Sequence, residues 1–162
     1  MQFPKIEDHR LYIDIPTFID GMYSIFSVDF LINHVLFQSR NVNLKSQPFW
    51  ELFSKSYDWT FHHIVTRDDN NIPPLRVLNT LRAERIRFPR HFIDNQNTLL
   101  VWNRRKENED RYYISDENFE YLVILAKRQT TQNFTLLSAF PTDQDHYRRK
   151  LKKEYEKCTW SP

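Results

Sequence analysis

Glycine is almost absent from this chain, since Gly21 is the only glycine among 162 residues. P-loop proteins and Rossmann nucleotide-binding domains need several closely spaced glycines around their phosphates, so the sequence excludes both classes. Cysteine is equally scarce, and the single Cys158 excludes an intramolecular disulfide and a cysteine-based metal site. A reducing, cytoplasmic location is therefore expected.

Long apolar runs and metal-binding patterns are lacking as well. No uninterrupted apolar run of about 18 residues is present and no secretion signal is recognisable, so we expect no membrane contact. His62 and His63 are adjacent, which in a strand would place them on opposite faces, and no close carboxylate-histidine motif accompanies them. The nucleophile elbow of the α/β hydrolases is missing too. The sequence therefore predicts no metal and no cofactor.

The chain does have enough apolar material to fold. Hydrophobic residues make up 40% and aromatic residues 15% of it, which is typical of a folded domain and not of a disordered tail. The turn-forming cluster Arg67–Asn71, followed by Pro73 and Pro74, is the best internal boundary. We therefore divide the chain into an N-terminal scaffold portion, residues 1–70, and a second portion, residues 71–162, and expect the two to form one compact unit.

Four short segments rich in β-forming residues follow one another in the second portion. They are Thr98–Trp102, Arg111–Ser115, Tyr121–Lys127 and Phe134–Phe140. The first two flank the charged loop Lys106–Asp110, a spacing typical of a hairpin, and short connections throughout favour an antiparallel meander. In the last segment, regular alternation would place Phe134, Leu136, Ser138 and Phe140 on one face.

Helices are predicted before, between and after these strands. The expected helices are Pro48 to about Lys55, Pro74 to about Ile86, and about Asp143 to Lys157, the last with a capping box formed by Thr142 and Asp145. The predicted fold is α+β, with helices packed on a small antiparallel sheet of about four strands.

The N-terminal portion is mixed and rich in aromatic residues. Leu11–Ile15 alternates like a short strand, whereas the apolar stretch Phe18–Phe37 leaves helix and strand open. We expect this portion to pack as scaffold.

Positive charge is concentrated in two segments. Arg76–His91 carries five arginines against Glu84, a local charge of +4, and Tyr147–Lys153 carries five basic residues, a local charge of +5. Because the whole chain carries only +2, the two segments at +9 leave −7 for the remainder. This asymmetry favours a polyanion such as RNA as partner, and solvated helix faces remain an alternative for either segment alone.

Two arginines of the first segment are unusual because they fall within or beside the apolar stripe of the predicted helix. Arg82 and Arg85 lie near the positions of Leu78, Leu81 and Ile86 on a helical wheel. An arginine on the inward side of a helix is costly unless it is paired or binds an anion. An internal ion pair and an anion site both remain open.

In the last predicted helix, Tyr147, Leu151 and Tyr155 recur every four residues and form a face that can pack on the sheet. His146, Arg149, Lys150 and Lys153 would lie to one side of this face, where they could border a cleft. The opposite wall of that cleft would come from Arg82–His91.

These residue types suit metal-free cleavage of RNA, in which a 2′-hydroxyl attacks the adjacent phosphate and a base, an acid and cations assist. The candidate catalytic residues are Arg85, His91, Ser138, Thr142 and His146, with His62 and His63 as further candidates. The candidate RNA-binding residues are Arg82, Arg87, Arg90, Arg148, Arg149, Lys150 and Lys153. Each also has a purely structural explanation. Thr142 would cap a helix, Ser138 would be a packed hydroxyl, and the histidines would lie on the surface or have a structural role.

The order of these segments resembles the C-terminal part of the bacterial toxin ribonucleases of the barnase, EndoU, colicin and RelE-like superfamily. The similarity rests on Tyr121–Lys127, on Phe134–Thr142 and on the basic helix that begins near Tyr147, and Arg82–Ile93 resembles the basic helix that precedes the sheet in that group. It covers about Arg82 to Lys157, and residues 1–70 have no counterpart.

The resemblance implies a concave sheet face that holds RNA and cleaves it without metal. It carries over the arginine and histidine of Arg85–His91, the hydroxyl of Ser138 or Thr142, and the basic residues that open the last helix. A cognate antitoxin or immunity protein is a further expected partner.

The leading hypothesis is therefore a metal-independent endoribonuclease toxin, or a defence or phage-encoded relative, that acts by 2′-hydroxyl transesterification. A non-catalytic RNA-binding protein of the same fold and a protein-interaction module, such as an immunity or inhibitor protein, are the alternatives.

Overall fold

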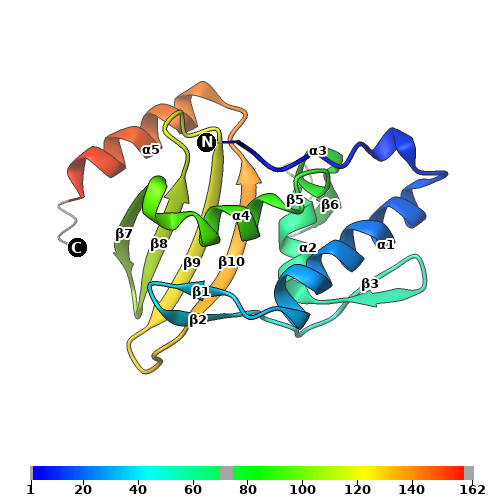
Figure 1. Ribbon diagram of the computed structural model, residues 1–162, viewed down its shortest axis with the longest axis horizontal. Coiled ribbons are helices and arrows are strands. Elements are labelled where there is room, and N and C mark those ends of the chain that lie inside the picture. The colour runs from blue at the N-terminus through cyan, green and yellow to red at the C-terminus, as the bar shows by residue number, and fades with distance from the viewer. Residues whose placement is uncertain (1, 70–74, 159–162) are drawn as a thin grey trace.

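A six-stranded sheet flanked by helices forms the centre of the computed structural model, which describes residues 2–69 and 75–158 (Figure 1). The helices are α1 (Ile15–Phe26), α2 (Trp59–Val65), α3 (Thr80–Ala83), α4 (Phe88–Asp94) and α5 (Asp145–Lys157). The strands are β1 (Leu36–Phe37), β2 (Arg40–Asn43), β3 (Trp50–Leu52), β4 (Lys55–Tyr57), β5 (Thr66–Asp68), β6 (Arg76–Leu78), β7 (Leu100–Lys106), β8 (Glu109–Ser115), β9 (Tyr121–Arg128) and β10 (Phe134–Pro141). Two 3₁₀ helices, His9–Leu11 and Gln96–Thr98, and a π-helical segment, Ser27–Ile32, are also present. The predicted α+β class is confirmed.

The strands of the main sheet lie in the order β1-β2-β10-β9-β8-β7. β7, β8, β9 and β10 form the predicted antiparallel meander, in which β7 and β8 are a hairpin. β2 pairs in parallel with β10 and antiparallel with β1, so the sheet is mixed and larger than the four strands predicted. The two extra strands are short and β2 is mostly polar, so they lack the alternating apolar pattern that reveals a strand in a sequence.

A β-bulge at Leu137 changes the two faces of β10. Leu136 pairs with Leu125 and Ser138 pairs with Ile124, so β10 advances two residues where β9 advances one. The prediction that Ser138 and Phe140 share a face with Phe134 and Leu136 is therefore wrong. Beyond the bulge, Ser138 and Phe140 lie on the face opposite to Leu136.

Each face of the sheet has its own apolar core. On one face, α1, α2 and α4 pack through Phe18, Phe61 and Phe92 against strand residues such as Leu125 and Leu136. This core combines residues of the N-terminal portion with residues of the meander. In Figure 1, α4 crosses the strands, and α1 and α2 lie on the β10 side of the sheet.

The smaller core, on the other face, lies under α5. Leu151 is buried there with Trp102 and Leu122, and Tyr147 and Tyr155 pack around them. The predicted docking face of the last helix is confirmed. The predicted capping box is wrong, because α5 begins at Asp145 with Gln144 as the N-cap residue, while the Thr142 hydroxyl donates to the Phe119 carbonyl oxygen.

The N-terminal stretch whose structure remained open is helical. Asp14 caps α1 by accepting a hydrogen bond from the Thr17 backbone N–H at 2.8 Å, and Pro16 suits the first turn. The predicted strand Leu11–Ile15 is wrong, since its residues lead out of a 3₁₀ helix into this cap. The helical run Ile15–Ile32 has the length and hydropathy to cross a membrane, yet Phe18, Ile19, Met22 and Phe26 are fully buried in the core, so it also fits the core helix of a globular protein.

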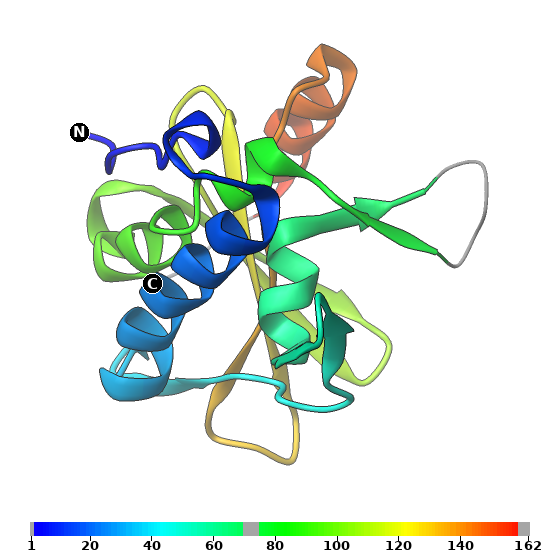
Figure 2. The ribbon, with the colours of Figure 1, turned by 90° about the vertical axis from the view of Figure 1, so that its right-hand side faces the viewer.

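Two predicted helices are replaced by small hairpins. The segment from Pro48 to Lys55 contains β3 and the first residue of β4. β6 pairs with β5 where a helix from Pro74 was expected, and the helix is reduced to α3, capped by Asn79; Pro74 itself lies outside the described residues. Figure 2 shows β5 and β6 projecting from the body of the molecule.

Candidate functional site

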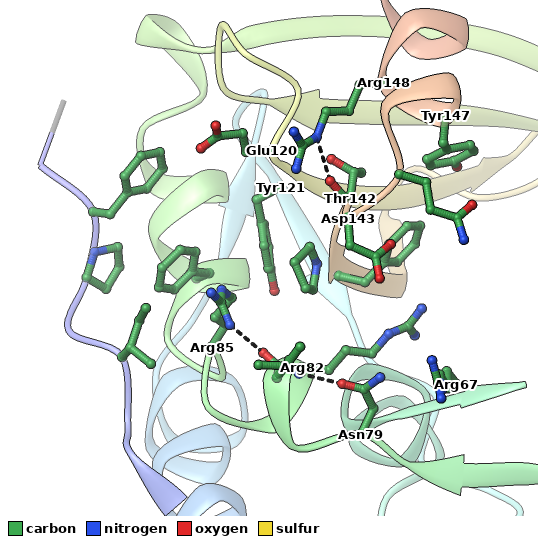
Figure 3. Close-up of a pocket in the computed structure, with 18 of the residues that line it drawn as sticks. Arg67, Asn79, Arg82, Arg85, Glu120, Tyr121, Thr142, Asp143, Tyr147 and Arg148 are labelled. Carbon is green, nitrogen blue, oxygen red and sulfur yellow. Dashed lines mark hydrogen bonds between the residues drawn. The ribbon is translucent and has the colours of Figure 1, made fainter.

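The main cleft lies where four separate parts of the chain meet. It has a volume of about 710 Å³ and is lined by the N-terminal segment, by the region from β5 to α4, by the start of β9, and by the segment from the end of β10 into α5 (Figure 3). Four arginines line it, namely Arg67, Arg82, Arg85 and Arg148. Of the two predicted walls, Arg82 and Arg85 of the first line this cleft, together with Thr142 and Arg148. The predicted α5 wall of His146, Arg149, Lys150 and Lys153 does not line it.

Arg82 is the most constrained of these cations. Its Nη1 donates to the Thr66 carbonyl oxygen at 2.6 Å, and its guanidinium carbon lies 4.7 Å above the centre of the Phe140 ring. No carboxylate of the described residues forms an ion pair with it. Burial lowers the pKa of Arg82, which marks an electrostatic cost that an anion in the cleft would relieve.

Arg85 and Arg148 are likewise held by backbone carbonyls. Arg85 Nη1 donates to the Leu81 carbonyl at 2.8 Å, and Arg148 Nε donates to the Thr142 carbonyl at 2.6 Å. Within the described chain no carboxylate is in ion-pair distance of Arg85, whereas Arg148 has a 3.5 Å contact with Asp145. Carbonyl partners orient a guanidinium without neutralising its charge, so these arginines remain able to bind an anion.

Tyr121 contributes a hydroxyl that lacks a partner. The residue opens β9, is 2% exposed, and its hydroxyl oxygen is buried without a hydrogen bond to any described group. Its ring extends toward the Arg82 and Arg85 side of the cleft (Figure 3). Burial raises the pKa of Tyr121, and the nearby Arg82 and Arg85 only partly oppose this, so the hydroxyl is protonated at neutral pH. A buried donor without an acceptor is costly, and a catalytic role, a water or an ion is a common reason for keeping one.

Carboxylates also border the cleft. Glu120 precedes Tyr121, and Asp143 follows Thr142 and is close enough to Arg82 to favour its charged form. Both side chains are exposed. The cleft therefore combines fixed cations, a protonated phenol and free carboxylates.

The other predicted arginines are tied to acids or carbonyls elsewhere. Arg87 Nε forms a 2.7 Å ion pair with Glu7, and Arg90 Nε forms one with Asp94 at 2.7 Å while its Nη1 donates to the Asp29 carbonyl. Neither lines the cleft. For Arg87 and Arg90, the ion pairs with Glu7 and Asp94 are thus a sufficient explanation of the positive charge.

None of the six histidines, all within the described residues, lines the cleft. His91 lies on α4 beside Phe92 and Asn95, with Nε2 buried and unpartnered, and burial lowers its pKa. His62 and His63 lie on α2, stacked on Trp50 and Trp59 respectively. Burial, with a smaller contribution from Arg76, lowers the pKa of each to about 4, so both are neutral at pH 7.

The remaining predicted residues fall into two other environments. Ser138 lies beyond the bulge of β10, on the face shared with Phe140, and does not line the cleft. His146, Arg149, Lys150 and Lys153 line a shallower groove along α5 with Glu154 and Lys157. Thr142 does line the cleft, but its hydroxyl is already engaged with the Phe119 carbonyl.

Sequence reasoning missed Tyr121, Arg67 and Asp143 as site residues. Tyr121 reads as one more apolar position of a buried strand, and only the three-dimensional arrangement reveals its unpartnered hydroxyl. Arg67 and Asp143 were assigned to a turn and a helix start. The one available signal was their proximity in sequence to basic segments.

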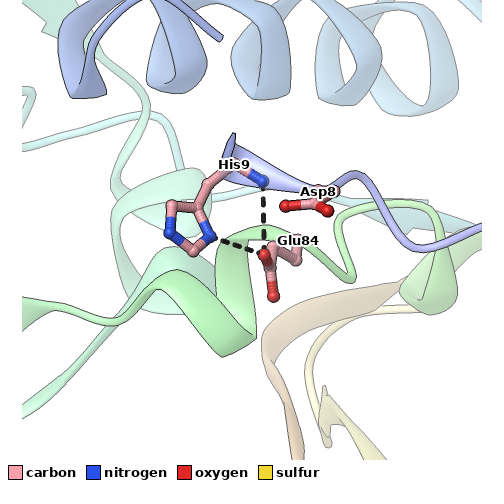
Figure 4. Close-up of side chains that lie close together, drawn as sticks. All are labelled: Asp8, His9 and Glu84. Carbon is pink, nitrogen blue, oxygen red and sulfur yellow. Dashed lines mark hydrogen bonds and ion pairs between the residues drawn. The ribbon is translucent and has the colours of Figure 1, made fainter. Parts of the chain in front are cut away.

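A cluster of potential metal ligands lies next to the cleft rather than in it. Asp8, His9 and Glu84 have ligand atoms within 4.8 Å of one another (Figure 4). His9 Nδ1 contacts Glu84 Oε1 at 2.7 Å, and Asp8 is paired with Arg10. These contacts fasten the N-terminal segment to the end of α3.

Comparisons of this chain with protein-family models, with curated proteins and with solved structures gave no match.

Proposed function

We propose that this protein binds RNA in the arginine-lined cleft and cleaves it by metal-independent transesterification. The observation that carries the proposal is the grouping of Arg82 and Arg85 around the Tyr121 hydroxyl. Among the described residues, the two arginines have no carboxylate partner and the hydroxyl has no hydrogen-bond partner. Fixed guanidinium groups suit phosphate oxygens, as they suit carboxylates, because their planar donor arrays can form two parallel hydrogen bonds to such an anion. RNA is the substrate that also supplies the attacking hydroxyl.

The cleft residues can divide the chemistry among them. The Asp143 carboxylate accepts the proton of the 2′-hydroxyl, whose oxygen forms a new bond to the adjacent phosphorus. The bond from phosphorus to the 5′-oxygen breaks, and Tyr121 donates its hydroxyl proton to that leaving oxygen. The products are a 2′,3′-cyclic phosphate and a free 5′-hydroxyl, while Arg82 and Arg85 stabilise the charge on the phosphorane.

The test is incubation of the purified protein with total RNA in the presence of a metal chelator. We expect fragments with 2′,3′-cyclic phosphate ends, and Tyr121→Phe should slow their formation by roughly 10²- to 10⁴-fold, the range for a general acid. The Phe ring preserves the packing, so the melting temperature serves as the folding control. Fragments that carry 5′-phosphates, or full activity of Tyr121→Phe, would contradict this mechanism.

Non-catalytic RNA binding in the same cleft is the second candidate. It is favoured by the position of the histidines, since the side chain most often used as a general base near neutral pH is missing from the lining. This candidate predicts salt-dependent binding of intact RNA and no new ends after prolonged incubation.

A further inference from the structure

The cleft has two chemically different halves. Arg67, Arg82 and Arg148 come from β5, α3 and the start of α5, whereas Phe3, Pro4 and Ile6 of the N-terminal segment and Phe88 of α4 form an apolar side. Arg85, from the turn after α3, lies on the same side of Tyr121 as the N-terminal segment (Figure 3). Tyr121 stands between the two, with its ring centre 5.1 Å from that of Phe88. One half suits a phosphate, and the other suits a flat apolar group attached to it.

The apolar side is a fixed wall because the N-terminal segment is fastened at several points. The Glu7 backbone N–H donates to the Glu84 carbonyl at 2.8 Å, the Glu7 carboxylate pairs with Arg87, and His9 contacts Glu84 (Figure 4). The Phe3 ring stacks on Phe88 with ring centres 5.7 Å apart. The segment is therefore positioned by its backbone and by charges, independently of what its apolar side chains contact in the cleft.

Those apolar side chains remain unusually accessible. Phe3 is 42% and Ile6 is 43% exposed, although each lines a cleft whose neighbouring apolar residues Phe88 and Tyr121 are almost fully buried. An aromatic ring with accessible surface beside a phosphate site is the arrangement by which proteins hold unpaired bases. A base within a duplex is stacked and paired, so it cannot enter such a cleft without first being extruded.

We propose that the N-terminal segment builds a nucleobase subsite, so that the substrate class is single-stranded RNA bound with one unpaired base against Phe3 and Ile6. The inference rests on the proposed function and specifies which RNA the cleft accepts. The phosphate next to that base lies against Arg82 and Arg85. The N-terminal segment is thus part of the substrate site and not only scaffold.

The test measures binding without cleavage, using a short 2′-O-methyl RNA that lacks the attacking hydroxyl. The probes are its single strand, its perfect duplex and a single strand of the same length with abasic positions. We expect the wild-type chain to prefer the single strand over the other two by about tenfold, the effect of stacking one base. The double variant Phe3→Ala, Ile6→Ala should bind all three probes equally weakly.

The matched control is Phe53→Ala, which removes a phenyl ring of similar exposure, 46%, from the turn between β3 and β4, outside the cleft lining. It should keep the wild-type preference. Equal wild-type affinity for single strand and duplex, or wild-type affinity in the double variant, would overturn the subsite. RNA cleavage in chelator would still stand in that case, whereas a wild-type chain that binds none of the probes would overturn both proposals.

Discussion

Two regions of this molecule are rich in positive charge, and they differ in how the charge is held. In the cleft, Arg82 and Arg85 are partly buried and bonded to backbone carbonyls. In the groove along α5, Arg149, Lys150 and Lys153 are exposed, with no ion pair or hydrogen bond among the described residues. Exposed cations are solvated and screened by salt, whereas oriented and partly desolvated cations bind anions more strongly. The cleft is therefore expected to bind an anion better than the groove along α5, although the α5 segment carries more positive charge in the sequence.

The largest expected effect on RNA binding distinguishes the cleft from the groove along α5. Replacing Arg82 by alanine should weaken RNA binding by roughly 10- to 100-fold, since a charge-assisted hydrogen bond contributes about 1.5–3 kcal/mol. Binding of a labelled RNA oligonucleotide at fixed salt measures this. Arg40→Ala is the matched control, because the Arg40 side chain hydrogen-bonds to Gln132 and neither residue lines the cleft. Equal losses for both variants would mean that the cleft has no special affinity.

A second difference concerns the histidines, which all lie outside the cleft. Because the pKa of His62 and of His63 falls from 6.5 to about 4 on folding, the unfolded chain binds more protons between these values. Their contribution to stability is therefore full above about pH 6.5 and is lost as the pH falls toward 4. We expect the melting temperature to fall over this range.

The matched variants for this pH effect are His62→Gln and His34→Gln. His62→Gln should flatten the fall in melting temperature between pH 6.5 and 4.5, whereas His34→Gln, at an exposed position, should leave it as in the wild type. RNA cleavage should change little in either variant. A cleavage defect in His62→Gln at unchanged stability would show that a histidine outside the cleft takes part in the reaction.

The smallest effect is expected in the groove along α5. The double variant Arg149→Ala, Lys150→Ala should weaken RNA binding only about two- to threefold at low salt, and not measurably at high salt, because exposed charges contribute about 0.2–1 kcal/mol. Lys152→Ala, on the same helix but outside the groove, is the control. A loss as large as that of Arg82→Ala would move the RNA site from the cleft to α5.

The sequence was sufficient for those elements whose pattern is local. The meander follows from four β-forming segments with short connections, and the docking of α5 follows from Tyr147, Leu151 and Tyr155. Arg82 and Arg85 could be singled out because their charges interrupt an apolar stripe. That signal led to the cleft even though the helix predicted from Pro74 to Ile86 is present only as α3, which follows β6.

Features that depend on contacts between residues far apart in the sequence could not be predicted from it. β6 forms because Arg76–Leu78 finds β5 as a partner, and Arg76 reaches across to Thr66 and Asp68. The sequence could not show that the histidines lie outside the cleft. His91 is close in sequence to Arg85 and Phe88, which line the cleft, yet its position on α4 keeps it out of the lining. Tyr121 shows the same limit, because the sequence does not reveal whether a buried hydroxyl finds an acceptor.

The bulged residue Leu137 reverses which face of the sheet the following residues of β10 point to. Before Leu137 the strand supplies Leu136 to the large core, and after it the same strand supplies Phe140 to the other face, where the ring meets Arg82. If Leu137 were instead paired in regular alternation, Ala139 and Phe140 would exchange faces, and the Phe140 ring would no longer lie at the cleft. The spacing along β10, as much as the identity of its residues, thus determines which side chain of the strand contacts Arg82.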